Sequence, residues 1–294
     1  MLLNMLNYKQ ANLVALLYFF YASVYLLFVL FKNHKQILTM HKTIIDVIVL
    51  HKRILCILLL LLPIIIFTID KTMLNLIFII KSYNISFILP NFITHNTYHL
   101  NIITMFDNFM NFMSFIAEGW ALVIIITTLI LFNSLAIQYY NNTNKLLFLQ
   151  KFNKVLELSL ITLLYSGLFN LFIKLIINRQ RPSIEYNNLN FFNFILSKEH
   201  NISSLFYASN SMPSGHTITA IACIMPLYIF FQRNKYIKYF LITIMSLMSF
   251  SRIYTINHWF SDVYCAIILG IIIAYGSYKH FFDQKISNKH NNMQ

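Results

Sequence analysis

Three short stretches in the second half of the chain combine residue types that can hold a phosphate group and break its ester bond. They read KLIINRQRP at residues 174–182, PSGH at residues 213–216 and SRIYTINHWFSD at residues 251–262. They supply fixed cations, two histidines, a serine and a carboxylate. Cations and backbone N–H groups stabilise phosphate oxygens, and histidine can attack phosphorus or transfer a proton near neutral pH. Phosphoryl transfer is the chemistry that this composition favours.

The first stretch places two cations on one side of an apolar segment. Lys174 and Arg181 are seven residues apart, close to two helical turns, so both side chains project to the same side if the segment is helical. Lys174 lies within the apolar run, where a charge near the bilayer centre costs about 2.5–3.5 kcal/mol. It therefore needs a partner or a cavity. We interpret Arg179 as an anchor that extends to the membrane interface from a helix end.

The second stretch is typical of a helix start. Ser214 can cap the helix that follows, and Gly215 allows the backbone to approach a ligand closely. The free N–H groups of a helix start favour an anion. His216 then stands at the mouth of the site as a candidate general acid. The alternative is an ordinary N-cap followed by an interfacial histidine.

The third stretch contains a histidine and a carboxylate four residues apart. If the segment is helical, His258 and Asp262 are neighbours on one face. A carboxylate that bonds one ring nitrogen fixes the tautomer and makes the other nitrogen a better nucleophile or base. Arg252 adds a planar donor fork that matches phosphate oxygens. The alternative is a structural pair that caps the last helix. We interpret the remaining histidines as interfacial or solvated: His34, His41, His51, His95, His99, His200, His280 and His290.

The elements that position these residues are expected to be transmembrane helices. Hydrophobic residues make up 58% of the 294 residues and charged residues only 11%, against about 25% charged residues in soluble domains. The net charge is +13, and the basic residues lie beside apolar segments. Their role in orienting the protein in the membrane explains this charge better than nucleic-acid binding does. We expect spans at residues 11–31, 54–69, 120–137, 155–177, 217–231, 236–250 and 263–278.

The predicted fold is all-α, a polytopic transmembrane helical bundle. Residues 1–53 are expected to form an N-terminal membrane anchor and a cytoplasmic loop, residues 54–281 the main transmembrane domain, and residues 282–294 a cytoplasmic tail. Residues 70–119 contain two apolar patches, 74–80 and 85–92, each too short to span, so we expect them to lie along the interface or to cap the bundle.

Basic residues predict the orientation of the bundle. They cluster in four places that alternate with much less basic connections, as in cytoplasmic loops. The clusters are Lys32, Lys35, Lys42, Lys52 and Arg53; Lys145, Lys151 and Lys154; Arg233, Lys235 and Lys238; and Lys279, Lys285 and Lys289. All three chemical stretches then meet at the opposite, extracytoplasmic surface. We expect an integral protein of a bacterial inner membrane whose site faces the periplasm or the cell exterior.

The order and spacing of the three stretches resemble the type 2 phosphatidic acid phosphatase superfamily, which also includes vanadium haloperoxidases. The resemblance covers roughly residues 120–278, and every defining motif position is matched. It implies that residues 54–281 form a transmembrane lipid phosphatase domain with a six-helix core, preceded by one extra N-terminal span. It also implies a phosphohistidine mechanism in which His258 attacks phosphorus and Asp262 orients its ring. His216 would protonate the leaving group and then activate water. The residues implied to bind phosphate are Lys174, Arg181, Ser214, Gly215 and Arg252.

The resemblance implies a lipid-borne phosphate as substrate, supplied laterally by the bilayer. Phosphatidic acid, phosphatidylglycerol phosphate, undecaprenyl pyrophosphate and lipid A phosphates all remain open, with a phosphomonoester lipid as the leading candidate. No metal and no cofactor are expected, because the carboxylates are scattered and three cations can stabilise the charge. An alternative of another class is a lipid or anion transporter that uses the cations only for binding. It would have no need of the paired His258 and Asp262.

Overall fold

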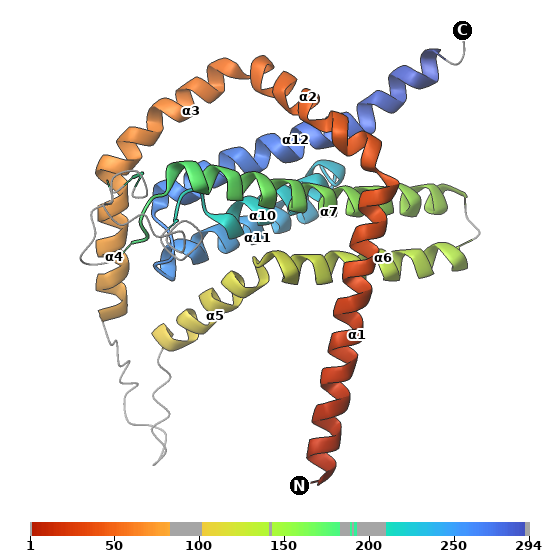
Figure 1. The fold of residues 1–294 in the computed structure, drawn as a ribbon, viewed down its shortest axis with the longest axis horizontal. Coiled ribbons are helices and arrows are strands. Elements are labelled where there is room, and N and C mark those ends of the chain that lie inside the picture. Colours follow the sequence, from red (N-terminus) through yellow and green to blue (C-terminus); the bar gives the residue numbers. More distant parts are fainter. Residues whose placement is uncertain are drawn as a thin grey trace.

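The structure, a computed structural model, describes residues 2–82, 102–140, 143–182, 189, 191–192 and 210–291. All regular structure in these residues is helical, which confirms the all-α prediction. The predicted apolar patch at 85–92 and most of the connection between residues 183 and 209 lie outside the described residues. Figure 1 gives the arrangement of the helices.

Helix α10 (Gly215–Phe230) is the centre of the bundle. It packs against α7 (Thr143–Ile177), α12 (Phe260–Asn291), α11 (Lys235–Tyr254) and α6 (Gly119–Tyr139), and its buried residues cover most of its circumference. A helix that is apolar on all sides has to be enclosed by others. Close packing also depends on Gly270 of α12, because a Cβ atom there would lie 2.8 Å from Cβ of Ile221 on α10.

The chain direction alternates between these helices, so their functional ends meet. The C-terminal ends of α7 and α11 lie beside the N-terminal ends of α10 and α12, at the left of the bundle in Figure 1. Backbone contacts join them: the Ser214 N–H donates to the Asp262 carbonyl at 3.2 Å, and the Ser211 N–H donates to the Arg179 carbonyl at 2.7 Å. The three stretches identified in the sequence are therefore neighbours.

Residues 52–81 form one continuous helix, not the span 54–69 followed by an interfacial segment that the sequence predicted. It consists of α3 (Lys52–Ile64), a π-helical turn η1 (Ile65–Ile69) and α4 (Asp70–Ser82). The π-helical turn follows Pro63, as expected where a proline disturbs the helical hydrogen bonds. Asp70 was taken as the end of the apolar segment. It stays inside the helix because its carboxylate has partners in the protein.

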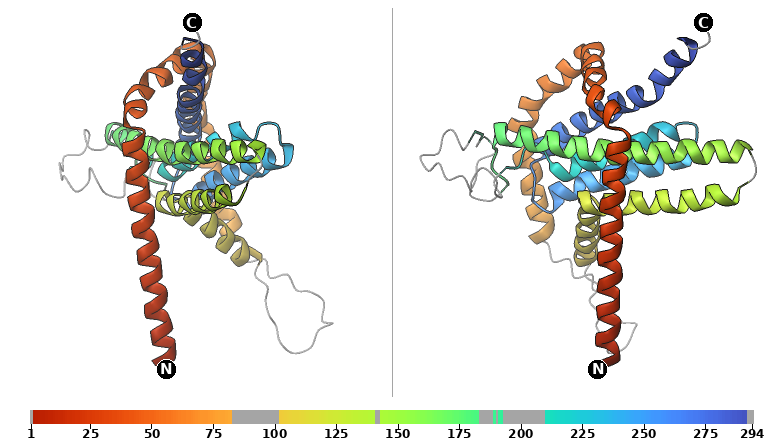
Figure 2. Two further views of the ribbon diagram at one scale, coloured as in Figure 1. Left: turned by 90° about the vertical axis from the view of Figure 1, so that its right-hand side faces the viewer. Right: turned by 45° about the vertical axis from the view of Figure 1, so that its right-hand side comes forward.

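The N-terminal helices α1 (Leu2–Lys32) and α2 (His34–Leu50) meet at a bend of 72°. Figure 2 shows α1 crossing the long axis of the bundle. Residues 34–50, part of the predicted cytoplasmic loop, form α2 and pack along α12. His280 of α12 is buried in this contact, with its ring nitrogens 3.2 and 2.8 Å from the hydroxyls of Thr39 and Thr43. The interpretation of His280 as interfacial or solvated was wrong.

Four of the described helices are long and apolar enough to cross a membrane. They are Lys52–Lys81, Gly119–Tyr139, Thr143–Ile177 and Phe260–Phe282, and the bent pair Leu16–Lys32 and His34–Leu50 passes the same criterion together. Helix α10 is apolar but shorter, and α11 carries two lysines in its first turn. Each predicted span has a helical counterpart. The remaining helix, α5 (Ile102–Ile116), packs against α11.

Candidate active site

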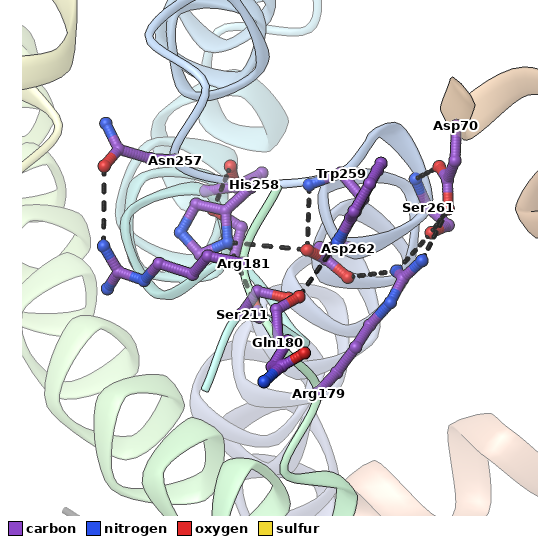
Figure 3. Close-up of polar contacts among 12 residues, drawn as sticks. Asp70, Arg179, Gln180, Arg181, Ser211, Asn257, His258, Trp259, Ser261 and Asp262 are labelled. Atoms are coloured by element: carbon purple, nitrogen blue, oxygen red, sulfur yellow. Dashed lines mark hydrogen bonds and ion pairs between the residues drawn. The ribbon is translucent and has the colours of Figure 1, made fainter. Parts of the chain in front are cut away.

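His258 lies in the short connection between α11 and α12, where its backbone N–H donates to the Arg252 carbonyl at 3.2 Å. Nδ1 of its ring is 2.7 Å from the Ser211 carbonyl oxygen and 3.7 Å from Oδ2 of Asp262 (Figure 3). A carbonyl oxygen only accepts, so Nδ1 carries the proton. Nε2 therefore keeps its lone pair, which is the form that a nucleophile needs.

The environment of His258 favours its neutral form. Burial is the main factor that lowers the pKa of His258, to about 4, and the cations Lys174 and Arg252 act in the same direction, while Asp262 opposes them. Desolvation and nearby positive charge both disfavour an imidazolium ion. The ring is consequently neutral at physiological pH.

Asp262 occupies the first turn of α12. Its Oδ2 accepts the backbone N–H of Trp259 at 2.9 Å, so the side chain closes the start of its own helix. His258 precedes that helix. The expected proximity of His258 and Asp262 is confirmed, although the helical-face argument that predicted it does not apply. The hydrogen bond that fixes the ring comes from the Ser211 backbone, which no side-chain pattern in the sequence could reveal.

Arg179 is fully buried, which corrects its interpretation as an interfacial anchor. One guanidinium nitrogen is 2.5 Å from Oδ1 of Asp262, and the other is 2.7 Å from Oδ2 of Asp70 (Figure 3). The guanidinium also lies over the rings of Phe191 and Trp259, at 4.7 and 5.3 Å. Two carboxylates and two aromatic faces hold this cation inside the protein.

Asp70 contributes to the end of the bundle where the three motifs meet, which the sequence analysis did not predict. It lies on α4, more than a hundred residues before the first motif, and it is fully buried. A signal for it did exist, because a lone carboxylate within an apolar helix is costly unless it is paired. The sequence could not name its partner.

Two of the cations expected to bind phosphate, Lys174 and Arg252, lie close enough to the buried His258 to lower its pKa. Arg181 is 3.4 Å from Oδ1 of Asn257, and Arg252 donates to the Ser114 hydroxyl of α5. Nε of each arginine is buried without a partner among the residues that the structure describes. Buried unpaired donors are rare in proteins, and an anion would satisfy both of them.

Gly215 and Lys174 approach each other at the start of α10. A Cβ atom on Gly215 would lie 3.2 Å from Nδ2 of Asn170 and 3.9 Å from Nζ of Lys174, so the missing side chain leaves room for these two groups. The close approach of a ligand to the Gly215 backbone stays a prediction. Ser214 is the N-cap residue as expected, yet its side chain makes no capping hydrogen bond. Its hydroxyl instead accepts from the Thr217 hydroxyl at 3.0 Å.

His216, the second residue of α10, is a neighbour of His258 and of the three cations. It interacts electrostatically with Arg252, His258, Lys174 and Arg181, and its Nε2 is 3.9 Å from Oε1 of Glu118. The side chain is about one-third exposed. It lines an open groove of about 450 Å³ between α6, α7 and α10, whose other lining residues include Trp120, Leu164, Leu168 and Leu171. The groove therefore combines a largely apolar lining with one of the candidate catalytic residues.

The part of the chain that carries the three motifs is similar to a known protein family. Residues 155–286, which contain all three motifs, match the family model described as the PAP2 superfamily. The match covers somewhat less than half of the chain, and we call residues 155–286 the PAP2 region. The PAP2 region begins within α7 and excludes α3, α4 and α5, so Asp70 and Ser114 are contributed from outside it.

A curated relative points to the same superfamily. A lipid A 1-phosphatase from Porphyromonas gingivalis is 38% identical over 68 residues, which are 23% of this chain and 15% of that protein. The similarity therefore covers a small part of the relative's length. No solved structure matches the chain.

Proposed function

We propose that this protein is an integral membrane phosphatase that removes phosphate from a lipid-borne phosphate ester through a phosphohistidine. The observation that carries the proposal is the His258 ring, whose Nδ1 proton is held by the Ser211 carbonyl, and whose pKa is lowered by burial and by the nearby cations Lys174 and Arg252. The match of residues 155–286 to the PAP2 superfamily supports the same reaction.

In the first step, Nε2 of His258 attacks phosphorus, a P–N bond forms, and the bond from phosphorus to the lipid oxygen breaks. His216 gives its proton to that oxygen, so a neutral alcohol leaves. In the second step, His216 takes a proton from water, the water oxygen attacks phosphorus, and the P–N bond breaks. Inorganic phosphate leaves and both histidines return to their starting forms.

The positive charges would hold the oxygens that do not react. A phosphomonoester carries close to two negative charges at neutral pH, and Lys174, Arg181 and Arg252 offer three positive ones. The unpaired Nε donors of the two arginines and the N–H groups at the start of α10 supply hydrogen bonds. Such a site stabilises the transition state by position and charge, which is the main requirement of phosphoryl transfer.

The site is proposed to face the periplasm or the cell exterior of a bacterial inner membrane. Lys145, Lys151 and Lys154 lie towards the N-terminal end of α7, and Arg233 and Lys235 lie at the turn between α10 and α11. Both clusters lie at the end of the bundle away from the motifs. Because basic residues concentrate in cytoplasmic loops, this distribution supports an extracytoplasmic site.

A lipid-borne phosphomonoester fits the groove beside His216, because an apolar chain can lie along Leu164, Leu168 and Leu171 while the phosphate reaches the cations. The name of the bacterial relative supports lipid A phosphates as a second candidate, and undecaprenyl pyrophosphate remains a candidate on resemblance alone.

The direct test is phosphate release by the purified protein in detergent, measured against a panel of these lipid phosphates. We expect release from at least one of them, and a fall of at least about 10²–10⁴-fold in the His258→Ala variant, the usual scale for a lost catalytic group. No release from any member would contradict the proposal. Lipid or anion transport without phosphate release would support a transporter instead.

A further inference from the structure

The guanidinium of Arg179 joins two carboxylates that come from different helices. Its NH1 atom is 2.5 Å from Oδ1 of Asp262 and 2.6 Å from the Ser261 hydroxyl, and its NH2 atom is 2.7 Å from Oδ2 of Asp70. Figure 3 shows these side chains in one line that ends beside His258. The Asp70, Arg179 and Asp262 side chains are all fully buried.

Asp70 is bound as tightly on its other side. Its Oδ1 accepts the Ser261 backbone N–H at 2.8 Å, and its Oδ2 accepts the Ser261 hydroxyl at 2.6 Å. The first N–H groups of a helix have no partner within the helix, so Asp70 supplies one to α12 from outside. The start of α12, which carries Asp262, is consequently fixed from two directions.

We propose that Asp70 is a positioning residue for phosphoryl transfer, holding Arg179 and thereby the Asp262 carboxylate beside His258. This inference rests on the proposed function. It assigns a catalytic purpose to the helix 52–81, which lies outside the PAP2 region.

The charges of the three residues favour the same arrangement. Arg179 with Asp262 alone would form a neutral pair and weaken the negative potential at His258. With Asp70 included, two carboxylates and one guanidinium leave one net negative charge in a buried place. The phosphohistidine ring carries a developing positive charge, and at low dielectric a nearby negative charge stabilises it strongly.

A purely structural ion pair would have different consequences. If Asp70 only anchored α4, its loss would lower stability and the amount of folded protein, while folded molecules would keep their kcat. If Asp70 positions Asp262, the folded variant turns over slowly and KM stays nearly constant, because the phosphate-binding cations are untouched. The separation of kcat from KM and from stability therefore distinguishes the two roles.

The experiment compares Asp70→Asn with wild type and with Glu157→Gln. The control loses a carboxylate of the same charge from an ion pair with Lys32 at 2.7 Å, at a distance from the site. We expect kcat of Asp70→Asn to fall about 10- to 100-fold with KM within about threefold, and Glu157→Gln to keep the wild-type kcat. Single-turnover formation of the phosphohistidine should slow by the same factor as kcat.

A second variant keeps the inference testable if Asp70→Asn does not fold. Ser261→Ala removes one hydrogen bond to Asp70 and one to Arg179 and leaves every charge paired. We expect its kcat to fall about 3- to 10-fold. If Asp70→Asn folds and keeps the wild-type kcat, the positioning role is overturned. If only Ser261→Ala folds, a wild-type kcat in that variant overturns it. If wild type releases no phosphate from any substrate, the proposed function fails first and the inference fails with it.

Discussion

The contact between α10 and α12 allows a stability prediction with a matched control. Both helices carry candidate catalytic residues, and they pack closely at Gly270. A Cβ atom at this position would lie 2.8 and 2.9 Å from Cβ and Cγ2 of Ile221 and 3.2 Å from the Ile218 carbonyl oxygen. None of these atoms is at the end of a flexible side chain, so Gly270→Ala has to move the two helices apart.

The size of the effect follows from two opposing contributions. Overpacking a core by one methyl group costs about 1–3 kcal/mol. Replacing glycine by alanine inside a helix stabilises by about 1 kcal/mol. The contacts at 2.8 and 2.9 Å are too short to be accommodated without a shift of the helices, which places the overpacking cost in the upper part of its range, about 2–3 kcal/mol. Gly270→Ala should therefore destabilise by roughly 1–2 kcal/mol net. Because the helix starts that hold His216 and Asp262 move apart with it, kcat should fall as well.

Gly167→Ala is the control, because the same methyl group on α7 would meet only Cγ2 of Thr219 at 3.7 Å, an ordinary contact. This variant should be as stable as wild type or more stable by up to about 1 kcal/mol. The assay is reversible unfolding in mixed micelles with increasing denaturing detergent. Equal stability of Gly270→Ala and wild type, or equal losses in both variants, would refute the packing argument.

Three further outcomes are expected. As pH falls from about 6.5 to about 4, unfolded chains take up a proton at His258 that the folded protein does not, so the unfolding free energy decreases over this range. His258→Gln should make that decrease smaller, and an unchanged pH slope would contradict the burial of a neutral ring. Ser114→Ala removes the hydrogen-bond acceptor that orients Arg252, so KM should rise by about tenfold, as measured by initial rates; an unchanged KM would show that Arg252 needs no such support. Vanadate, which mimics five-coordinate phosphorus, should inhibit at millimolar concentration or below, and full activity there would argue against a phosphate site at His258.

The sequence was sufficient to predict that the three motifs meet. Their apolar flanks predicted helices, and alternating helix direction then placed the end of α7, the start of α10 and the connection before α12 at one end. The motif residues could be proposed without a structure, because an ionisable side chain within an apolar segment is costly unless it has a partner or a function.

The ion-pair and hydrogen-bond partners of individual side chains could not be predicted, since they depend on tertiary contacts. Arg179 looked like an anchor because it is next to a helix end, and only the fold shows that Asp70 and Asp262 reach it. His280 was misjudged for the same reason, since its hydroxyl partners are on α2. The predicted end of the second span at residue 69 was also wrong, because the helix continues through the π-helical turn Ile65–Ile69 into α4.

The central claim is that one phosphoryl group is transferred to His258 at the end of this bundle. Rapid quenching during turnover of a ³²P-labelled lipid phosphate, followed by peptide mapping, tests it most directly. An acid-labile label on His258 is predicted. With an aryl phosphate, whose leaving group needs no proton, the label should accumulate in His216→Gln because water activation is then the slow step. Turnover with no label on the protein, or with the label on another residue, would contradict the account.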